Sequence, residues 1–132
     1  LFNTSTFAPL IVSAPGFPAG QRSDALVEFV DIYPALCELT GVGAPEHLQG
    51  KSFVPLMKDV SNPWKKAVFS RYHDGESVIT ERYSYTEWND GARMLYDHRK
   101  DPDENVNISE NPENLRIVQQ MKKLLWEHRK SL

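Results

Sequence analysis

The spacing of apolar side chains changes at residue 67 to a period of two, and this change limits what the chain can fold into. A period of two is the spacing of half-buried strands, and it continues to residue 96. Asn89-Asp90-Gly91 is a strong turn signal, and Glu81-Arg82 separates two further alternating segments. The pattern predicts a small antiparallel sheet of four strands, at residues 67–72, 77–80, 83–88 and 93–96.

A helix is predicted after a polar loop at residues 101–111. Asn111-Pro112-Glu113 is typical of a helix start, with Asn as the cap, Pro in the first turn and an early acid. At about 100° per residue, the apolar side chains between Leu115 and Trp126 share one broad face. Basic residues crowd the last turns, where the helix dipole favours cations. We expect this helix to cover one face of the sheet.

A short apolar run at residues 9–14 is closed by Pro15-Gly16. Because it is apolar on both faces, it predicts a buried strand, of the kind found in parallel sheets. It is the longest apolar run in the chain and is far shorter than the roughly 20 residues that a membrane helix needs. We therefore expect no membrane partner.

A second helix is predicted between Asp31 and Gly41. Asp31 can cap free backbone N–H groups, and Pro34 is tolerated in a first turn. Ile32, Leu36 and Leu39 follow at the spacing of one apolar face, and Gly41 ends the helix. Residues 52–57 are expected to form one further helical turn.

Length and composition set the class of protein. The chain has 132 residues, of which 40% are hydrophobic and 25% charged, so it fits one globular domain or a piece of one and excludes a disordered chain. The net charge of −3 gives no electrostatic case for nucleic acid, and we expect no nucleic-acid partner. Cys37 is the only cysteine, which excludes an internal disulfide and a cysteine-based zinc site.

The candidate chemical residues do not assemble into a self-contained active site. None of the four histidines is three or four residues from another, so a helical metal site is excluded. The acids between Asp97 and Glu104 lack the spacing of a calcium loop and are typical of a turn. His73 ends a strand before Asp74-Gly75, a place where binding residues often lie. His73 and, more weakly, Arg71 are therefore the candidate substrate contacts. The simpler alternative is that His73 is an ordinary surface residue.

Five segments of the chain follow recognisable sequence patterns, in a fixed order, at residues 8–16, 30–41, 49–56, 79–88 and 95–107. They are similar, in that order, to "VPLI…PG", "DLYPTLLELAG", "LDGxSLxPLL", "RTxRYRYTEW" and "LYDLxxDPxExxNL". Ile79 and Ser84 stand where the fourth pattern has basic residues. Together these segments resemble the C-terminal part of the sulfatase family in the alkaline phosphatase superfamily, and the closest branch is that of iduronate and choline sulfatases.

The resemblance implies a fold and a division of the chain. Residues 1–60 would be the C-terminal end of the main α/β domain, including the end of its main sheet. Residues 61–132 would be a small α+β subdomain with about four antiparallel strands and a packing C-terminal helix. The chain would be a fragment or a processed light chain, and its partner would be the N-terminal portion of the same sulfatase.

The resemblance also implies a mechanism whose central groups lie elsewhere. Sulfatases carry a Cys or Ser in a C/S-x-P-x-R motif that is matured to formylglycine, together with a calcium ion. The motif occurs nowhere here, since Cys37 is followed by Glu-Leu-Thr. We therefore expect no catalytic residue, metal ligand or cofactor in this chain, and we expect the chain alone to be inactive and indifferent to calcium.

The implied substrate is a sulfated sugar or a small sulfate ester, and family members are exported to a periplasmic, secreted or lysosomal location. His73 and Arg71 would lie on a loop near the pocket mouth. Two alternatives stay open at this point: a phosphonate or phosphate monoester hydrolase of the same superfamily, and a stand-alone binding module. The coding region upstream of Leu1 would separate the enzyme from the module.

Overall fold

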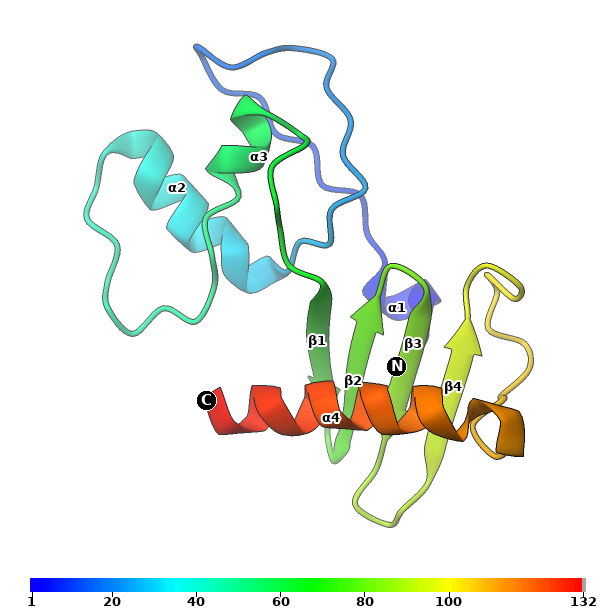
Figure 1. Cartoon of the computed structure of the whole chain (residues 1–132). Coiled ribbons are helices and arrows are strands. Elements are labelled where there is room, and N and C mark those ends of the chain that lie inside the picture. The colour runs from blue at the N-terminus through cyan, green and yellow to red at the C-terminus, as the bar shows by residue number, and fades with distance from the viewer. Residues whose placement is uncertain (132) are drawn as a thin grey trace. The chain divides into compact units, whose positions relative to one another are not determined.

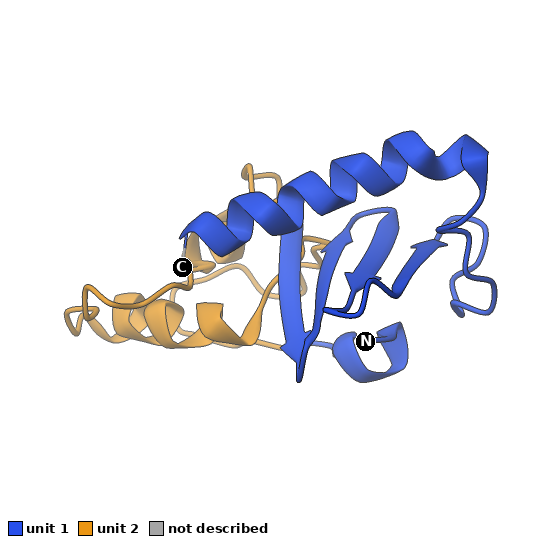
Figure 2. Cartoon of the chain, turned by 90° about the horizontal axis from the view of Figure 1, so that it is seen from below, with its two compact units in different colours: residues 1–9, 66–132 blue, residues 10–65 orange. Residues whose placement is uncertain are grey.

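Two compact units make up the chain in the structure, a computed structural model that describes residues 1–131 (Figure 2). The first unit contains residues 1–9 and the chain from residue 66 onward, and the second contains residues 10–65. The predicted division near residue 60 refers to domains of a complete sulfatase and stays a prediction. Within this chain, residues 1–9 belong with the sheet.

The sheet of the first unit has the predicted topology. Its four strands are antiparallel and adjacent in chain order, joined by short turns (Figure 1). The strands are β1 (Ala67–Tyr72), β2 (Gly75–Thr80), β3 (Tyr83–Glu87) and β4 (Arg93–Asp97). The predicted α+β subdomain with a four-stranded sheet is therefore confirmed.

Helix α4 (Leu115–Ser131) follows the 3-10 turn η2 (Pro112–Asn114) and lies across one face of the sheet (Figure 1). The buried core between them joins Val78, Tyr85 and Leu95 of the sheet to side chains of α4, namely Val118, Met121 and Leu125. This packing confirms the prediction that the helix covers one face of the sheet. The buried face of the helix is narrower than predicted, because Leu115 and Trp126 are half exposed. The predicted Asn111 side-chain cap is wrong, since its backbone carbonyl accepts the Asn114 N–H instead.

The N-terminal residues cover the other face of the sheet. Helix α1 (Asn3–Thr6) lies on the side opposite α4 in both views (Figures 1 and 2), and the Phe2 ring contacts Tyr96 of β4. The sequence did not predict this helix. The strand predicted at residues 9–14 is absent from the described chain: these residues have no regular structure, and Ile11 is 92% exposed. A strand forms only with a hydrogen-bonding neighbour, and this segment has none within the described residues.

Two helices and a 3-10 turn organise the second unit: η1 (Phe29–Asp31), α2 (Ile32–Thr40) and α3 (Val54–Lys58). Its buried core is formed by Ala35, Phe53, Val54 and Leu56. Gly41 ends α2 in the left-handed region, at φ +71°, as predicted. The predicted apolar face is partly wrong, because Ile32 and Leu39 pack on the core while Leu36 is half exposed.

Asp31 has a different role from the predicted helix cap, since its side chain makes no cap bond to α2. It is fully buried and accepts hydrogen bonds from the backbone N–H groups of Glu28 and Lys51, at 2.9 and 2.7 Å. The Lys65 ammonium donates to both Asp31 oxygens, at 2.6 and 2.8 Å, and to Glu28 at 2.7 Å. A buried carboxylate is stable only when paired and hydrogen-bonded, and this one joins three separate segments of the unit.

No helix among the described residues is long and apolar enough to cross a membrane.

Candidate functional site

The predicted substrate contacts lie on the β1–β2 hairpin. Tyr72 pairs with Gly75 across the hairpin, so His73 and Asp74 form a two-residue turn. His73 has φ +52°, in the left-handed region that disfavours residues with a side chain. Its ring meets Tyr72 edge-on, with centroids 4.3 Å apart. The turn therefore presents an exposed imidazole on a constrained backbone.

Arg71 holds this turn from the strand side. Its Nε donates to the His73 carbonyl at 3.2 Å, and its Nη1 lies 3.6 Å from the Glu76 carboxylate. The side chain remains 70% exposed, so part of the guanidinium can reach another group. The structure thus brings Arg71 and His73 together, and their contact with substrate stays a prediction.

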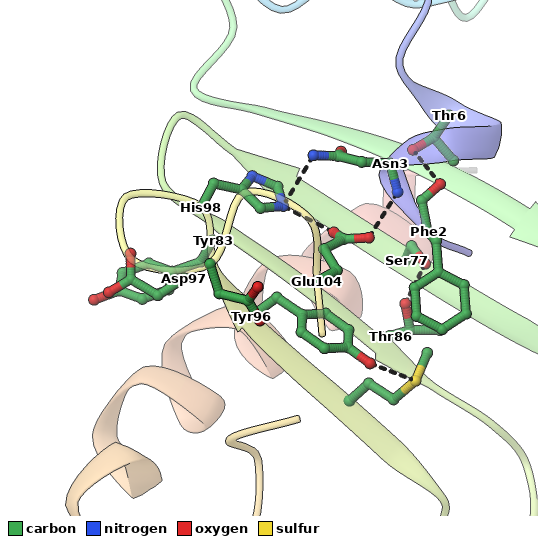
Figure 3. A network of polar contacts seen from close by, with 12 residues as sticks. Phe2, Asn3, Thr6, Ser77, Tyr83, Thr86, Tyr96, Asp97, His98 and Glu104 are labelled. Atoms are coloured by element: carbon green, nitrogen blue, oxygen red, sulfur yellow. Dashed lines mark hydrogen bonds and ion pairs between the residues drawn. The ribbon is translucent and has the colours of Figure 1, made fainter. Parts of the chain in front are cut away.

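A second polar cluster, around Glu104, was missed in the sequence. The buried Glu104 carboxylate accepts the Asn3 backbone N–H at 2.7 Å and lies 2.8 Å from His98 Nε2 (Figure 3). The Asn3 amide nitrogen lies 3.3 Å from the same His98 atom. Glu104 also has a left-handed backbone, at φ +55°. The cluster links the N-terminal segment to the loop after β4. The sequence gives no signal for it, because Asn3 and its partners Glu104 and His98 are about a hundred positions apart.

The acids near residue 100 close turns, as predicted. Asp101 accepts the Val106 N–H at 2.8 Å and the Asn105 side-chain amide at 3.1 Å, and these bonds lower its pKa. Asp97 forms a two-point ion pair with Arg82, at 2.7 and 3.0 Å, which holds the Asp97 pKa below its ordinary value. These carboxylates are therefore committed to structure.

The residues present do not fit the calcium ion or the formylglycine that the resemblance implies. Within residues 1–131, no three His, Cys, Asp or Glu side chains gather as metal ligands would. Cys37 is buried inside α2, and the residues after it lack the required Pro and Arg. No catalytic step can be assigned to either group from this chain.

Arg71 and His73 line neither of two moderate surface hollows found among the described residues of the first unit. One, of about 440 Å³, lies beside α1 and is lined by Asn3, Phe7 and Glu104 among others. The other, of about 420 Å³, includes Arg82, Tyr83 and Ile117. The Arg82 guanidinium in the second hollow is already engaged by Asp97.

Comparison with known families decides the relationship. Residues 1–131 match the family described as N-sulphoglucosamine sulphohydrolase, C-terminal. The chain belongs to this sulfatase C-terminal family. The predicted membership of the sulfatase family, as its C-terminal part, is therefore confirmed, and the match extends over the whole described chain.

Individual sulfatases agree with this assignment. A sulfatase of Formosa agariphila is 32% identical over 126 residues, which cover 95% of this chain and 25% of that protein. Human arylsulfatase K is 30% identical over 125 residues, covering 83% of this chain and 23% of that enzyme. This sulfatase C-terminal chain thus spans about a quarter of the length of the curated relatives it matches.

Solved structures share the fold. A 2-O GAG sulfatase superposes with a TM-score of 0.70 at 28% identity, over 76% of this chain and 24% of that one. The phosphonate monoester hydrolase of Silicibacter pomeroyi superposes with a TM-score of 0.83, over 90% of this chain and 28% of that one. Its 20% identity shows the fold alone, so it does not favour phosphonate chemistry for the sulfatase C-terminal chain.

Proposed function

We propose that this chain is the C-terminal part of an enzyme that hydrolyses sulfate esters, and that the nucleophile and metal site come from the remainder of that enzyme. The family match over residues 1–131 carries this proposal, and the relatives of similar sequence are named as sulfatases. In the complete enzyme, calcium and formylglycine would supply charge stabilisation and the nucleophile. This chain would supply part of the scaffold and part of the pocket rim.

The partner of the chain is the N-terminal portion of the same sulfatase. Residues 9–14 support this part of the proposal, because they are apolar and yet lack regular structure here. Ile11, the most exposed large apolar side chain within residues 1–131, has 92% of its surface in water. Such a segment gains free energy when a neighbouring strand covers it, at about 25 cal/mol per Å² of apolar area.

The substrate class is a sulfated sugar, and His73 and Arg71 contact it. A 2-O GAG sulfatase among the related structures supports a sugar substrate. The His73 side chain is exposed on the constrained turn and the Arg71 side chain is exposed near the end of β1, and both can donate hydrogen bonds to sugar or sulfate oxygens. Neither residue is proposed to take part in bond cleavage.

The test is kinetic and uses the complete enzyme. His73→Ala is expected to lower kcat/KM for a sulfated sugar severalfold while leaving the thermal midpoint nearly unchanged, since the side chain is exposed. His73→Asn is the matched control for the backbone, because Asn tolerates the left-handed region. Both variants must lose activity if the imidazole contacts the substrate. Unchanged kinetics in both would make His73 an ordinary surface residue.

The chain alone provides a second test. We expect it to show no turnover of an aryl sulfate and no tight calcium binding by calorimetry, because the groups for both lie in the remainder of the enzyme. Turnover above the buffer blank would place an active site within this chain and overturn the proposal. A complete enzyme that hydrolyses phosphonate esters faster than sulfate esters would replace the proposed reaction class.

A further inference from the structure

Strand β1 ends, β2 begins and β3 ends at the same end of the sheet, so their terminal residues are neighbours. Tyr72 pairs with Gly75, and the last residue pair between β2 and β3 is Glu76 with Glu87. Arg129 of α4 contacts both of these glutamates, so Glu76 and Glu87 lie on the α4 face. Side chains alternate along a strand, and the neighbouring positions 72, 75 and 88 therefore lie on the opposite face.

Gly75 leaves room for the indole of Trp88. A Cβ atom at position 75 would lie 2.6 Å from Trp88 Nε1 and 3.1 Å from two ring carbons. The Trp88 backbone is fixed by the β3–β4 turn, since its N–H donates to the Ala92 carbonyl at 3.0 Å and its carbonyl accepts the Gly91 N–H at 3.0 Å. The indole thus lies against the sheet in a position set by the absence of a side chain at residue 75.

Tyr72 is the neighbour of this position on β1. It is 67% exposed, and its ring meets the His73 ring edge-on. Large aromatic side chains contribute most to stability when they are buried. The exposed Tyr72 ring therefore contributes little to the stability of the fold. The left-handed backbone of His73 is likewise unfavourable for the fold. An exposed aromatic group beside a strained turn is typical of a surface that meets a ligand.

We propose that Tyr72, His73 and Trp88 form an aromatic platform that binds a sugar ring of the saccharide substrate. This inference rests on the proposed function and adds Tyr72 and Trp88 to the contacts. The faces of aromatic rings are electron-rich, and they attract the weakly positive C–H groups on one face of a pyranose. Such rings also lose little side-chain freedom on binding.

The charges beside the platform favour a sugar ring over the sulfate group. Asp74 offers an exposed carboxylate acceptor at the turn, whereas Arg71 lies with Glu76 on the α4 face and reaches the turn through its bond to the His73 carbonyl. Sugar hydroxyl groups can donate hydrogen bonds to the Asp74 carboxylate. A sulfate would be repelled by Asp74, and Arg71 is already paired with Glu76. The platform therefore holds a ring of the saccharide, and the ester group lies toward the remainder of the enzyme.

The first experiment measures binding to the 132-residue chain. The indole N–H signals of the three tryptophans are assigned by single Trp→Phe replacements and then followed by NMR during titration with N-acetylglucosamine 6-sulfate or inorganic sulfate. The sulfated sugar is expected to shift the Trp88 signal, and inorganic sulfate is expected to leave it unchanged. Trp126, which is half exposed on α4, is the internal control and should not move. A Trp88 shift with sulfate alone, or equal shifts at both indoles, would overturn the platform.

The second experiment measures kinetics in the complete enzyme. Tyr72→Ala is a surface change that should not unfold the chain, and it is expected to raise KM for a sulfated disaccharide about fivefold with kcat retained. Tyr72→Phe keeps the ring and is expected to retain most of the affinity. KM for 4-nitrophenyl sulfate, which has no sugar, should change less than twofold.

The two proposals fail in different ways. If the complete enzyme hydrolyses sulfate esters but Tyr72→Ala leaves KM for the disaccharide unchanged, the platform is wrong and the proposed function stands. If the complete enzyme hydrolyses no sulfate ester while the Trp88 signal still responds to the sulfated sugar, the proposed function is wrong and the sugar platform stands.

Discussion

Replacing Lys65 by Met is expected to destabilise the second unit by about 3 kcal/mol. The ammonium of Lys65 neutralises a carboxylate that has no exposed surface, that of Asp31, and it also contacts Glu28. Breaking a buried ion pair by removing one partner costs roughly 3–5 kcal/mol, because the other charge stays buried without compensation. The lower end applies here, since Lys65 keeps 19% of its side-chain surface in water and two backbone N–H groups still bind Asp31.

The assay is urea unfolding followed by the fluorescence of Trp64. Trp64 lies in the same unit, where its indole donates to the Leu26 carbonyl at 2.7 Å. The other two tryptophans are replaced by Phe so that only this unit reports. With a slope of about 1–3 kcal/mol per M, a loss of about 3 kcal/mol lowers the midpoint by at least 1 M. Lys66→Met is the matched control, since Lys66 is exposed, and it should change stability by less than about 0.5 kcal/mol. A loss below about 1 kcal/mol for Lys65→Met would refute the reasoning.

The same ion pair predicts a dependence on alkaline pH. Burial alone would lower the pKa of Lys65, but its hydrogen bonds to Asp31 and Glu28 outweigh burial and raise the pKa above the ordinary value of 10.5. A raised pKa in the folded state means that the stabilisation is complete below pH 10.5 and is lost as the pH rises through the folded value. The wild-type chain should therefore lose stability in this alkaline range, and Lys65→Met should lack that loss.

Two further changes test the packing of each unit. Gly50→Ala would place a Cβ atom 1.9 Å from a backbone carbonyl oxygen, so we expect a loss of about 2 kcal/mol or more in urea unfolding. Gly43→Ala, where a Cβ meets no atom within 4 Å, should be nearly neutral, and equal stability of the two variants would contradict this packing. Glu104→Ala removes the acceptor of the Asn3 N–H, so hydrogen exchange at that amide should accelerate about tenfold or more. Asp103→Ala, at an exposed neighbour, should leave the exchange rate unchanged.

The sequence determined the local elements of the first unit because its signals there are local. Alternating apolar residues and the turn at Asn89-Asp90-Gly91 predict β3 and β4 without knowledge of any distant residue. The apolar face of α4 is equally readable from its spacing, and Val118, Met121 and Leu125 are buried as that spacing requires. The ordered motifs also identified the family, since each depends only on residues close in the chain.

The tertiary structure alone decided the features that depend on distant neighbours. The segment at residues 9–14 has the composition of a strand but no partner within the described chain, and backbone hydrogen bonding needs one. The local sequence predicts Asp31 as a helix cap, but in the fold its carboxylate is neutralised by Lys65, which is 34 positions away. The meeting of Asn3 with Glu104 and of Gly75 with Trp88 likewise depends on register and chain path, which spacing along the sequence does not encode.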